Sequence, residues 1–138
     1  MIGIVIVAHG GLAKEYLAAM EHVVGTHEGT RAISIGPDDD RAAKQAEIGA
    51  AIKAVDAGDG VVVVTDIHGG TPSNLAVAAC GRADRQVLCG ANLPMLVKLA
   101  KARNMKMKDA VDTAISAGRK YINSMGMPIP PVGGAPGA

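Results

Sequence analysis

Two turns, far apart in the chain, hold the residues whose types could do chemistry. His9 follows a run of Ile and Val, and Asp66 follows a second apolar run. A carboxylate that accepts a proton from one imidazole nitrogen fixes the tautomer of the ring and leaves the lone pair of the other nitrogen free. If the two turns meet, His9 is therefore predicted to be a nucleophile that Asp66 orients and stabilises.

Glycines beside both residues indicate which group such a nucleophile would attack. Glycine lets a backbone approach a ligand closely, and amide N–H groups at helix N-termini attract anions. Gly10, Gly69 and Gly70 are therefore predicted to surround a phosphoryl group, and Thr71 to add a hydroxyl donor. Together these residues predict a phosphotransferase with a phosphohistidine intermediate on His9.

Three further residues are candidates for the same pocket. His68 is either a second site residue or simply part of the Gly-rich turn. Asn92 and Pro94 follow the fourth apolar run, where a role in capping a helix explains them nearly as well. The sequence has no GxxxxGK[ST] and no GxSxG motif, which argues against a nucleotide-binding P-loop and a serine hydrolase. Neither a metal site nor a cofactor is predicted.

Alternating strand and helix patterns must position these residues. Continuous apolar runs predict strands at 2–8 and 61–64, an alternating pattern predicts one at 31–36, and a fourth is predicted at 86–89; helical spacing follows each of them. This order predicts an α/β fold with an open, mainly parallel sheet and helices on both faces. Ligands bind beyond the carboxyl ends of such strands, so His9 and Asp66 meet if the first and third strands are neighbours.

The helical stripes indicate which residues should face the sheet. The first helix is expected to present Leu12, Tyr16, Met20 and Val23, and the last helix Val111, Ala114, Ile115, Gly118 and Ile122. The acidic run 38–40 is predicted to cap the second helix and not to bind a metal.

Length and composition favour one small domain. The chain has 138 residues, a net charge of +1 and neither Phe nor Trp, so nucleic acid is not an expected partner. No apolar stretch approaches the length of a membrane span. Cys80 and Cys89 are predicted to be reduced, small core residues of a cytoplasmic protein. A domain is expected at 1–126, and the Pro/Gly-rich tail 127–138 is expected to be disordered or the beginning of a linker.

Three segments resemble the mannose-type IIA component of the bacterial phosphoenolpyruvate-dependent sugar phosphotransferase system. They are residues 3–10, residues 64–74, which are similar to a D-x-x-G-G-[ST]-P-x-N pattern, and residues 90–96. The resemblance covers roughly residues 1–125 and implies a three-layer α/β sandwich. It implies that the phosphocarrier protein HPr phosphorylates His9 on Nε2, with Asp66 as the hydrogen-bonded carboxylate and Thr71 near the phosphoryl group.

The same resemblance implies partners. The family is usually a homodimer in which a C-terminal strand can cross to the partner subunit, and phosphate passes to a IIB component. The membrane is involved only indirectly, through the IIC and IID components that admit the sugar. No IIB domain follows in this chain, and Ile67-His68 stands where the mannose transporter's protein has a bulkier aromatic residue. A regulatory role therefore stays open beside sugar transport.

Other functions also stay open on the sequence alone. A phosphodonor subunit for dihydroxyacetone kinase looks similar over the first segment but fits the glycine-rich segment less well. A tetrapyrrole-chelatase-like enzyme would use His9 and His68 to hold a metal or a porphyrin. A non-catalytic module would bind an anion at the helix N-termini.

Overall fold

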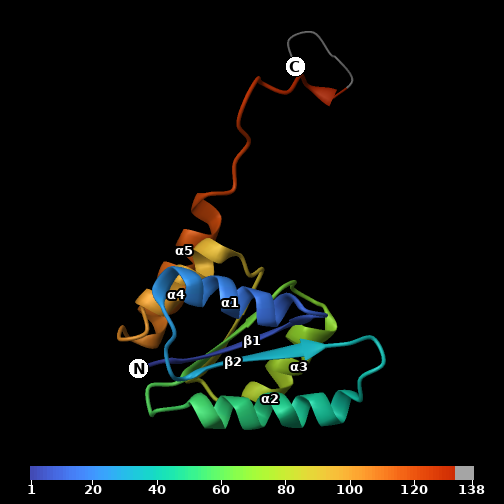
Figure 1. Ribbon diagram of the computed structural model, residues 1–138, viewed down its shortest axis with the longest axis vertical. Helices are drawn as coiled ribbons and strands as arrows, with labels where there is room; N and C mark the ends of the chain where they lie inside the picture. Colours follow the sequence, from blue (N-terminus) through green and yellow to red (C-terminus); the bar gives the residue numbers. More distant parts are fainter. Residues whose placement is uncertain (133–138) are drawn as a thin grey trace.

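The computed structural model describes residues 1–132 of the chain. Within these residues four parallel strands form one sheet in the order β2-β1-β3-β4 (Figure 1). Their bounds are β1 Gly3–His9, β2 Thr30–Ile35, β3 Val61–Thr65 and β4 Arg85–Cys89. The predicted parallel α/β fold is confirmed. The strands β1 and β3 are neighbours, as the predicted meeting of His9 and Asp66 requires.

Five helices cover the two faces of the sheet within the described residues. One face carries α1 Leu12–Val24, α4 Leu93–Lys101 and α5 Met107–Lys120, and the other carries α2 Arg41–Val55 and α3 Thr71–Cys80. Side chains alternate along β1, because successive residues of a strand point to opposite faces. Ile4 and Ile6 pack in the core below α1, α4 and α5, whereas Val5 and Val7 pack against α2 and α3. Both faces of the sheet are therefore buried in apolar cores.

The side chains expected to face the sheet were predicted wrongly at the ends of α1 and at the end of α5. Leu12 and Val23 are 44% and 52% exposed, whereas Ala13 and Met20 are buried. The helix α1 is rotated so that the small Ala13 side chain faces the sheet, which turns its neighbour Leu12 toward solvent. Ile122 is 75% exposed because α5 ends at Lys120, before the predicted stripe does.

The acidic run before α2 has the capping role that was predicted for it. Asp40 is the N-cap, and its Oδ1 accepts hydrogen bonds from the backbone N–H of Ala42 and of Ala43, at 3.0 and 3.5 Å. Asp39 accepts a 2.6 Å hydrogen bond from the N–H of Gly36 and so closes the loop after β2. The two bonds to Asp40 satisfy donors that the start of a helix otherwise leaves free.

Arg103 closes the amino edge of the sheet, opposite to His9. Its side chain is buried, and it donates hydrogen bonds to three backbone carbonyls: Ile2 at 2.6 Å, and Glu28 and Gly29 at 3.0 Å each. Burial lowers the pKa of the Arg103 guanidinium. One side chain therefore joins the start of β1, the turn before β2 and the loop between α4 and α5.

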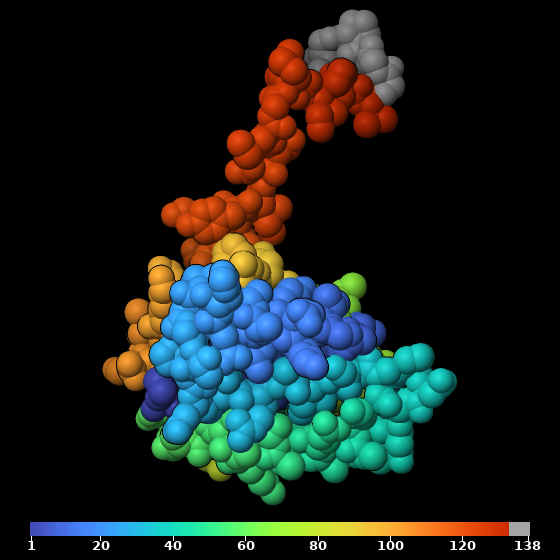
Figure 2. All heavy atoms as spheres, viewed as in Figure 1, coloured from blue at the N-terminus to red at the C-terminus, as the bar shows by residue number. Residues whose placement is uncertain are grey.

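The chain leaves the domain after α5. Residues 122–131 contain no helix or strand, and Figures 1 and 2 show this segment standing away from the packed elements. The predicted tail 127–138 lies partly outside the described residues. Among the residues that the structure describes, no helix combines the length and the apolar character needed to cross a membrane.

Candidate functional site

His9 and Asp66 meet at the carboxyl edge of the sheet. The register of β1 and β3 pairs Val7 with Thr65, so the last residue of β1 lies beside the first residue after β3. The His9 Nδ1 is 2.8 Å from Oδ2 of Asp66, and the backbone N–H of His9 donates to the same oxygen at 3.0 Å. The His9 side chain is 51% exposed, whereas that of Asp66 is 8% exposed. Nδ1 is therefore occupied, and Nε2 is the nitrogen left for a reaction.

The surroundings of Asp66 favour its ionised form. Burial acts to raise the pKa of this carboxyl, but the backbone and ring of His9 oppose burial through two hydrogen bonds and charge attraction. The N–H of Ile67 adds a 2.9 Å hydrogen bond to Oδ1. The net result is a pKa of Asp66 below its ordinary value. A carboxylate at this place keeps the proton of the neutral imidazole on Nδ1.

The glycines near His9 shape the backbone more than they offer donors. The N–H of Gly10 donates to the carbonyl of Ile35 at 3.0 Å, and the N–H of Gly69 donates to Oγ of Ser73 at 3.0 Å. A Cβ atom at Gly70 would lie 3.2 Å from Cε1 of His9, so glycine permits the close approach there. At the start of α3, Pro72 has no N–H and the N–H of Asn74 donates to the carbonyl of Gly70, so the N–H groups of Thr71 and Ser73 are those without an intrahelical partner.

Ser73 holds the glycine turn in place, a role that sequence reasoning missed. Its buried hydroxyl donates to the carbonyl of Gly70 at 3.0 Å while accepting from Gly69. Ser73 belongs to no GxSxG motif, so its neighbours in the sequence do not mark it as a nucleophile. The signal that points to its role is its position, the third residue of a helix that begins directly after two glycines.

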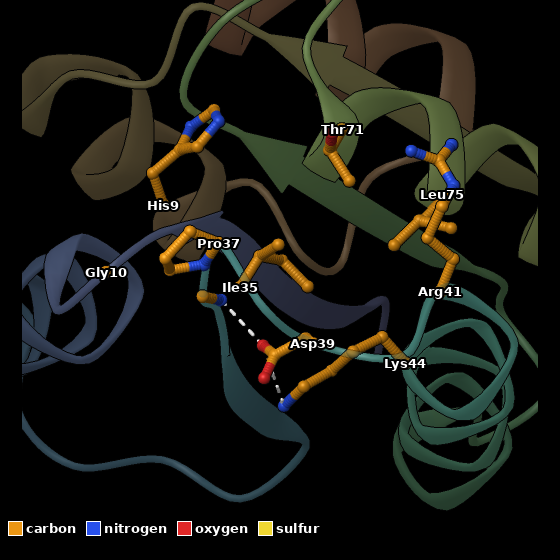
Figure 3. A pocket seen from close by; sticks show the side chains of 10 residues that line it. His9, Gly10, Ile35, Pro37, Asp39, Arg41, Lys44, Thr71 and Leu75 are labelled. Carbon is orange, nitrogen blue, oxygen red and sulfur yellow. Dashed lines mark hydrogen bonds and ion pairs between the residues drawn. The ribbon is translucent and has the colours of Figure 1, made fainter.

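A cavity of about 440 Å³ opens beside His9 (Figure 3). It lies between the loop after β2, the start of α2 and the start of α3. Its lining consists of His9, Gly10, Ile35, Gly36, Pro37, Asp39, Arg41, Lys44, Thr71 and Leu75. The structure thus places Thr71 and Gly10 with His9, and it adds the cations Arg41 and Lys44, which the sequence analysis did not single out. Their position after an acidic helix cap gave no reason to connect them with the first turn.

The remaining candidates lie elsewhere. His68 is exposed in the turn and is not part of the cavity lining. Asn92 caps α4 by accepting from the N–H of Met95 at 3.0 Å, and its amide donates to the carbonyl of Gly118 at 2.8 Å. Pro94 is in the first turn of the same helix. The helix-capping interpretation of Asn92 and Pro94 therefore describes what the structure shows.

The chelatase-like alternative finds no support. Within residues 1–132 no three His, Cys, Asp or Glu side chains gather closely enough to hold a metal ion. His68 does not join His9 in the cavity. The site instead offers one half-exposed imidazole, a buried carboxylate and donors at a helix start, which is a set of groups suited to an anionic phosphoryl group.

Comparisons with known proteins agree with this chemistry. The family model EIIA-man, described as "PTS system fructose IIA component", matches residues 3–115. The mannose-specific EIIAB component of the phosphotransferase system of Escherichia coli strain K12 is 28% identical over 127 residues, which are 90% of this chain. The chain spans 39% of that relative's length.

Two solved structures have the same fold. A phosphotransferase system component EIIA from Streptococcus agalactiae is 29% identical, with a TM-score of 0.80 over 90% of this chain and 97% of that one. A mannose/sorbose specific IIA subunit from Enterococcus faecalis is 26% identical, with a TM-score of 0.80 over 93% and 97%. The fold, the residues around His9 and the family match agree, and this chain belongs to the mannose/fructose IIA family of the phosphotransferase system.

Proposed function

We propose that this chain is a phosphoryl-relay protein that takes phosphate from phospho-HPr onto Nε2 of His9. The phosphate then passes to a IIB component or serves as a regulatory signal in the phosphorylated protein. The observation that carries the proposal is the 2.8 Å contact between His9 Nδ1 and Asp66, which leaves Nε2 unpartnered among the described residues on a half-exposed ring. We assign this role to a phosphocarrier domain of residues 1–126.

The proposed transfer balances without any further reactant. The Nε2 lone pair of neutral His9 attacks phosphorus, the N–P bond to the donor's histidine breaks, and its electron pair returns to the donor's imidazole. The His9 ring then carries positive charge, and the ionised Asp66 stabilises it through Nδ1. The reverse sequence of bonds delivers the phosphoryl group to an acceptor. Asp66 stays ionised throughout and moves no proton.

Groups at the start of α3 are proposed to hold the phosphoryl oxygens. Thr71 lines the same cavity as His9, and the N–H groups of Thr71 and Ser73 have no intrahelical partner. Gly10 and Gly69 are proposed to shape the site, since their N–H groups already donate elsewhere. A charge-assisted hydrogen bond contributes about 1.5–3 kcal/mol, so a few such bonds decide whether a phosphohistidine persists.

Labelling tests this proposal directly. The chain is incubated with enzyme I, HPr and phosphoenolpyruvate, and an acid-labile, base-stable phosphate is expected on the wild-type protein. His9→Ala should take up none. His22→Ala, which alters an exposed histidine of α1, should be labelled like the wild type. An unlabelled wild type contradicts the relay role, and a labelled His9→Ala contradicts the site.

We also propose that the protein is a homodimer in the cytoplasm. The segment after α5 exposes large apolar side chains, at 62% for Tyr121 and 75–91% for Ile122, Met125, Met127 and Ile129. Several exposed apolar side chains along one segment suit a protein contact. The free thiols of Cys80 and Cys89 suit a reducing compartment. Sedimentation equilibrium should give twice the 13.9 kDa chain mass, and a monomer mass would contradict the dimer.

A further inference from the structure

The cavity beside His9 is larger than a phosphoryl group requires. Its volume of about 440 Å³ falls within the range of about 300–1,000 Å³ that is usual for small-molecule sites. Figure 3 shows His9 at one end and the guanidinium of Arg41 beyond Thr71 at the other. Ile35 and Leu75 supply apolar lining, and Asp39 adds a carboxylate that lies 3.9 Å from Lys44. The cavity therefore has the reactive imidazole at one end, a cation at the other and apolar side chains in its lining.

The two cations of the cavity differ in whether their charge is already compensated. The Nζ of Lys44 is 3.0 Å from a carboxylate oxygen of Glu47 and 3.9 Å from one of Asp39. Arg41 makes no ion pair with any residue that the structure describes, and its side chain is exposed. The guanidinium of Arg41 therefore brings an uncompensated positive charge and a planar set of donors to the cavity.

The stability of α2 does not explain why its first residue is an arginine. Arg41 is the first residue of α2, where the helix dipole disfavours a cation. Asp40 already caps this helix, so its stability does not depend on the Arg41 side chain. A positive charge at this position has a small electrostatic cost for α2. The stability of α2 therefore gives no reason for an arginine at this position.

We propose that the cavity binds a small organic anion, either a carboxylate or a phosphate ester with a partly apolar body. Its charged group pairs with Arg41, and its body lies against Ile35 and Leu75. Guanidinium groups match carboxylates and phosphates with two parallel hydrogen bonds, so both kinds of ligand satisfy the same site. The volume and the mixed lining favour a small molecule over a partner's side chain.

Such a ligand would oppose phosphorylation of His9, a consequence that depends on the function proposed above. A phosphoryl group on Nε2 adds nearly two negative charges at the other end of the same cavity. The two anions repel, so each lowers the affinity of the protein for the other by the same factor. The bound anion also fills space beside the ring that an approaching phosphodonor needs. The concentration of the anion would thus control how much of the protein is phosphorylated on His9.

Binding to the unphosphorylated full chain is the first test. Calorimetric titration with 4-methyl-2-oxopentanoate and with phenyl phosphate separates the carboxylate from the phosphate ester, and phenol is the neutral control. At least one anion should bind saturably, and Arg41→Gln should raise its dissociation constant about tenfold or more. Arg119→Gln, which removes an exposed charge on α5, should leave the dissociation constant unchanged. Equal weakening by both substitutions would overturn the assignment of the site.

The second test separates this inference from the relay function. Phosphoramidate, a small phosphodonor that needs no HPr, is used to phosphorylate His9, and the bound anion should slow labelling several-fold in wild type but not in Arg41→Gln. Anion binding with unchanged labelling would refute the coupling. If HPr labels His9 but neither anion binds, the relay stands and this inference is wrong. A higher KM for HPr in Arg41→Gln without anion binding would instead make the cavity a protein-docking surface and overturn the inference.

Discussion

At the scale of single residues, Asp66 determines how His9 is presented. Its Oδ2 accepts from both the ring and the backbone N–H of His9, so the imidazole is fixed relative to its own main chain. Its Oδ1 accepts from the N–H of Ile67. All three hydrogen bonds favour the ionised carboxylate, and together they outweigh the burial that would raise its pKa. The same contacts therefore serve both the chemistry and the stability of the folded chain.

Replacement of this carboxylate should change how stability depends on acid. Because the pKa of Asp66 is lowered in the folded protein, its contribution to stability is complete above the ordinary carboxyl pKa. That contribution is lost as pH falls through the lowered value. The stability advantage of wild type over Asp66→Asn should therefore shrink as pH is reduced from about 5, below the usual range of imidazole titration. Urea unfolding at a series of pH values measures it.

Asp56→Asn is the matched control for that experiment, since Asp56 is a carboxylate at the opposite edge of the sheet. Its acid profile reports what the loss of a carboxylate remote from His9 does. An advantage over Asp66→Asn that stays constant or grows with acid would contradict the lowered pKa of Asp66.

The sequence predicted that His9 and Asp66 meet, but it did not predict that Arg41 lines the same cavity as His9. His9 and Asp66 were predictable because both follow apolar strands, and parallel neighbours bring their carboxyl ends to one edge. Arg41 belongs to another element, and only the packing of α2 against the sheet brings it to the cavity. Local spacing carries no information about such an approach.

At the scale of elements, the turn between β3 and α3 depends on one hydroxyl. Ser73 belongs to the first turn of α3, yet both of its hydrogen bonds go back to the two glycines that precede the helix. Those glycines include Gly70, which lies directly beside the His9 ring. The hydroxyl thus couples the start of α3 to the place where the phosphoryl group is proposed to lie.

Removal of that hydroxyl should affect both stability and transfer. Ser73→Ala leaves the N–H of Gly69 without its acceptor in a partly buried place, which should cost about 1–3 kcal/mol of unfolding free energy. The loosened turn should also slow phosphorylation of His9. Urea unfolding and the initial rate of labelling measure the two effects. Ser116→Ala, on the exposed side of α5, is the control and should change neither the unfolding free energy nor the labelling rate. If Ser73→Ala also changed neither, the turn would not depend on the Ser73 hydroxyl.

The elements were more predictable than their orientations. Four strands and the helix starts followed from apolar runs and capping residues, which are local signals. The face that a helix buries depends on which side chain fits closest to the sheet. For α1 the small Ala13 takes that place, and the larger Leu12 is left exposed.

At the scale of the whole molecule, the two edges of the sheet have different tasks. The carboxyl edge is open and carries His9, whereas the amino edge is closed by the buried guanidinium of Arg103. No spacing in the sequence marks Arg103, because its three carbonyl acceptors lie about 75–100 residues away in the chain. A long-range cation of this kind becomes visible only when the strands are assembled.

Arg103 should therefore matter for stability and not for chemistry. Arg103→Met keeps a long side chain but leaves three carbonyls, those of Ile2, Glu28 and Gly29, without this donor. We expect a loss of about 1–3 kcal/mol in unfolding free energy, because the buried carbonyl of Ile2 is left unsatisfied, whereas that of Gly29 still accepts from the N–H of Ile4. Arg103→Lys, with a compact ammonium group, should fall between the two proteins. Arg119→Met, an exposed change of the same kind, should cost little.

The rate of His9 labelling per folded molecule should stay unchanged, since the site lies at the other edge. Urea unfolding measures the free energy of unfolding. Labelling at low temperature, where the variant is folded, measures the rate of phosphorylation of His9. A slower relay in fully folded Arg103→Met would mean that the two edges are coupled through the sheet.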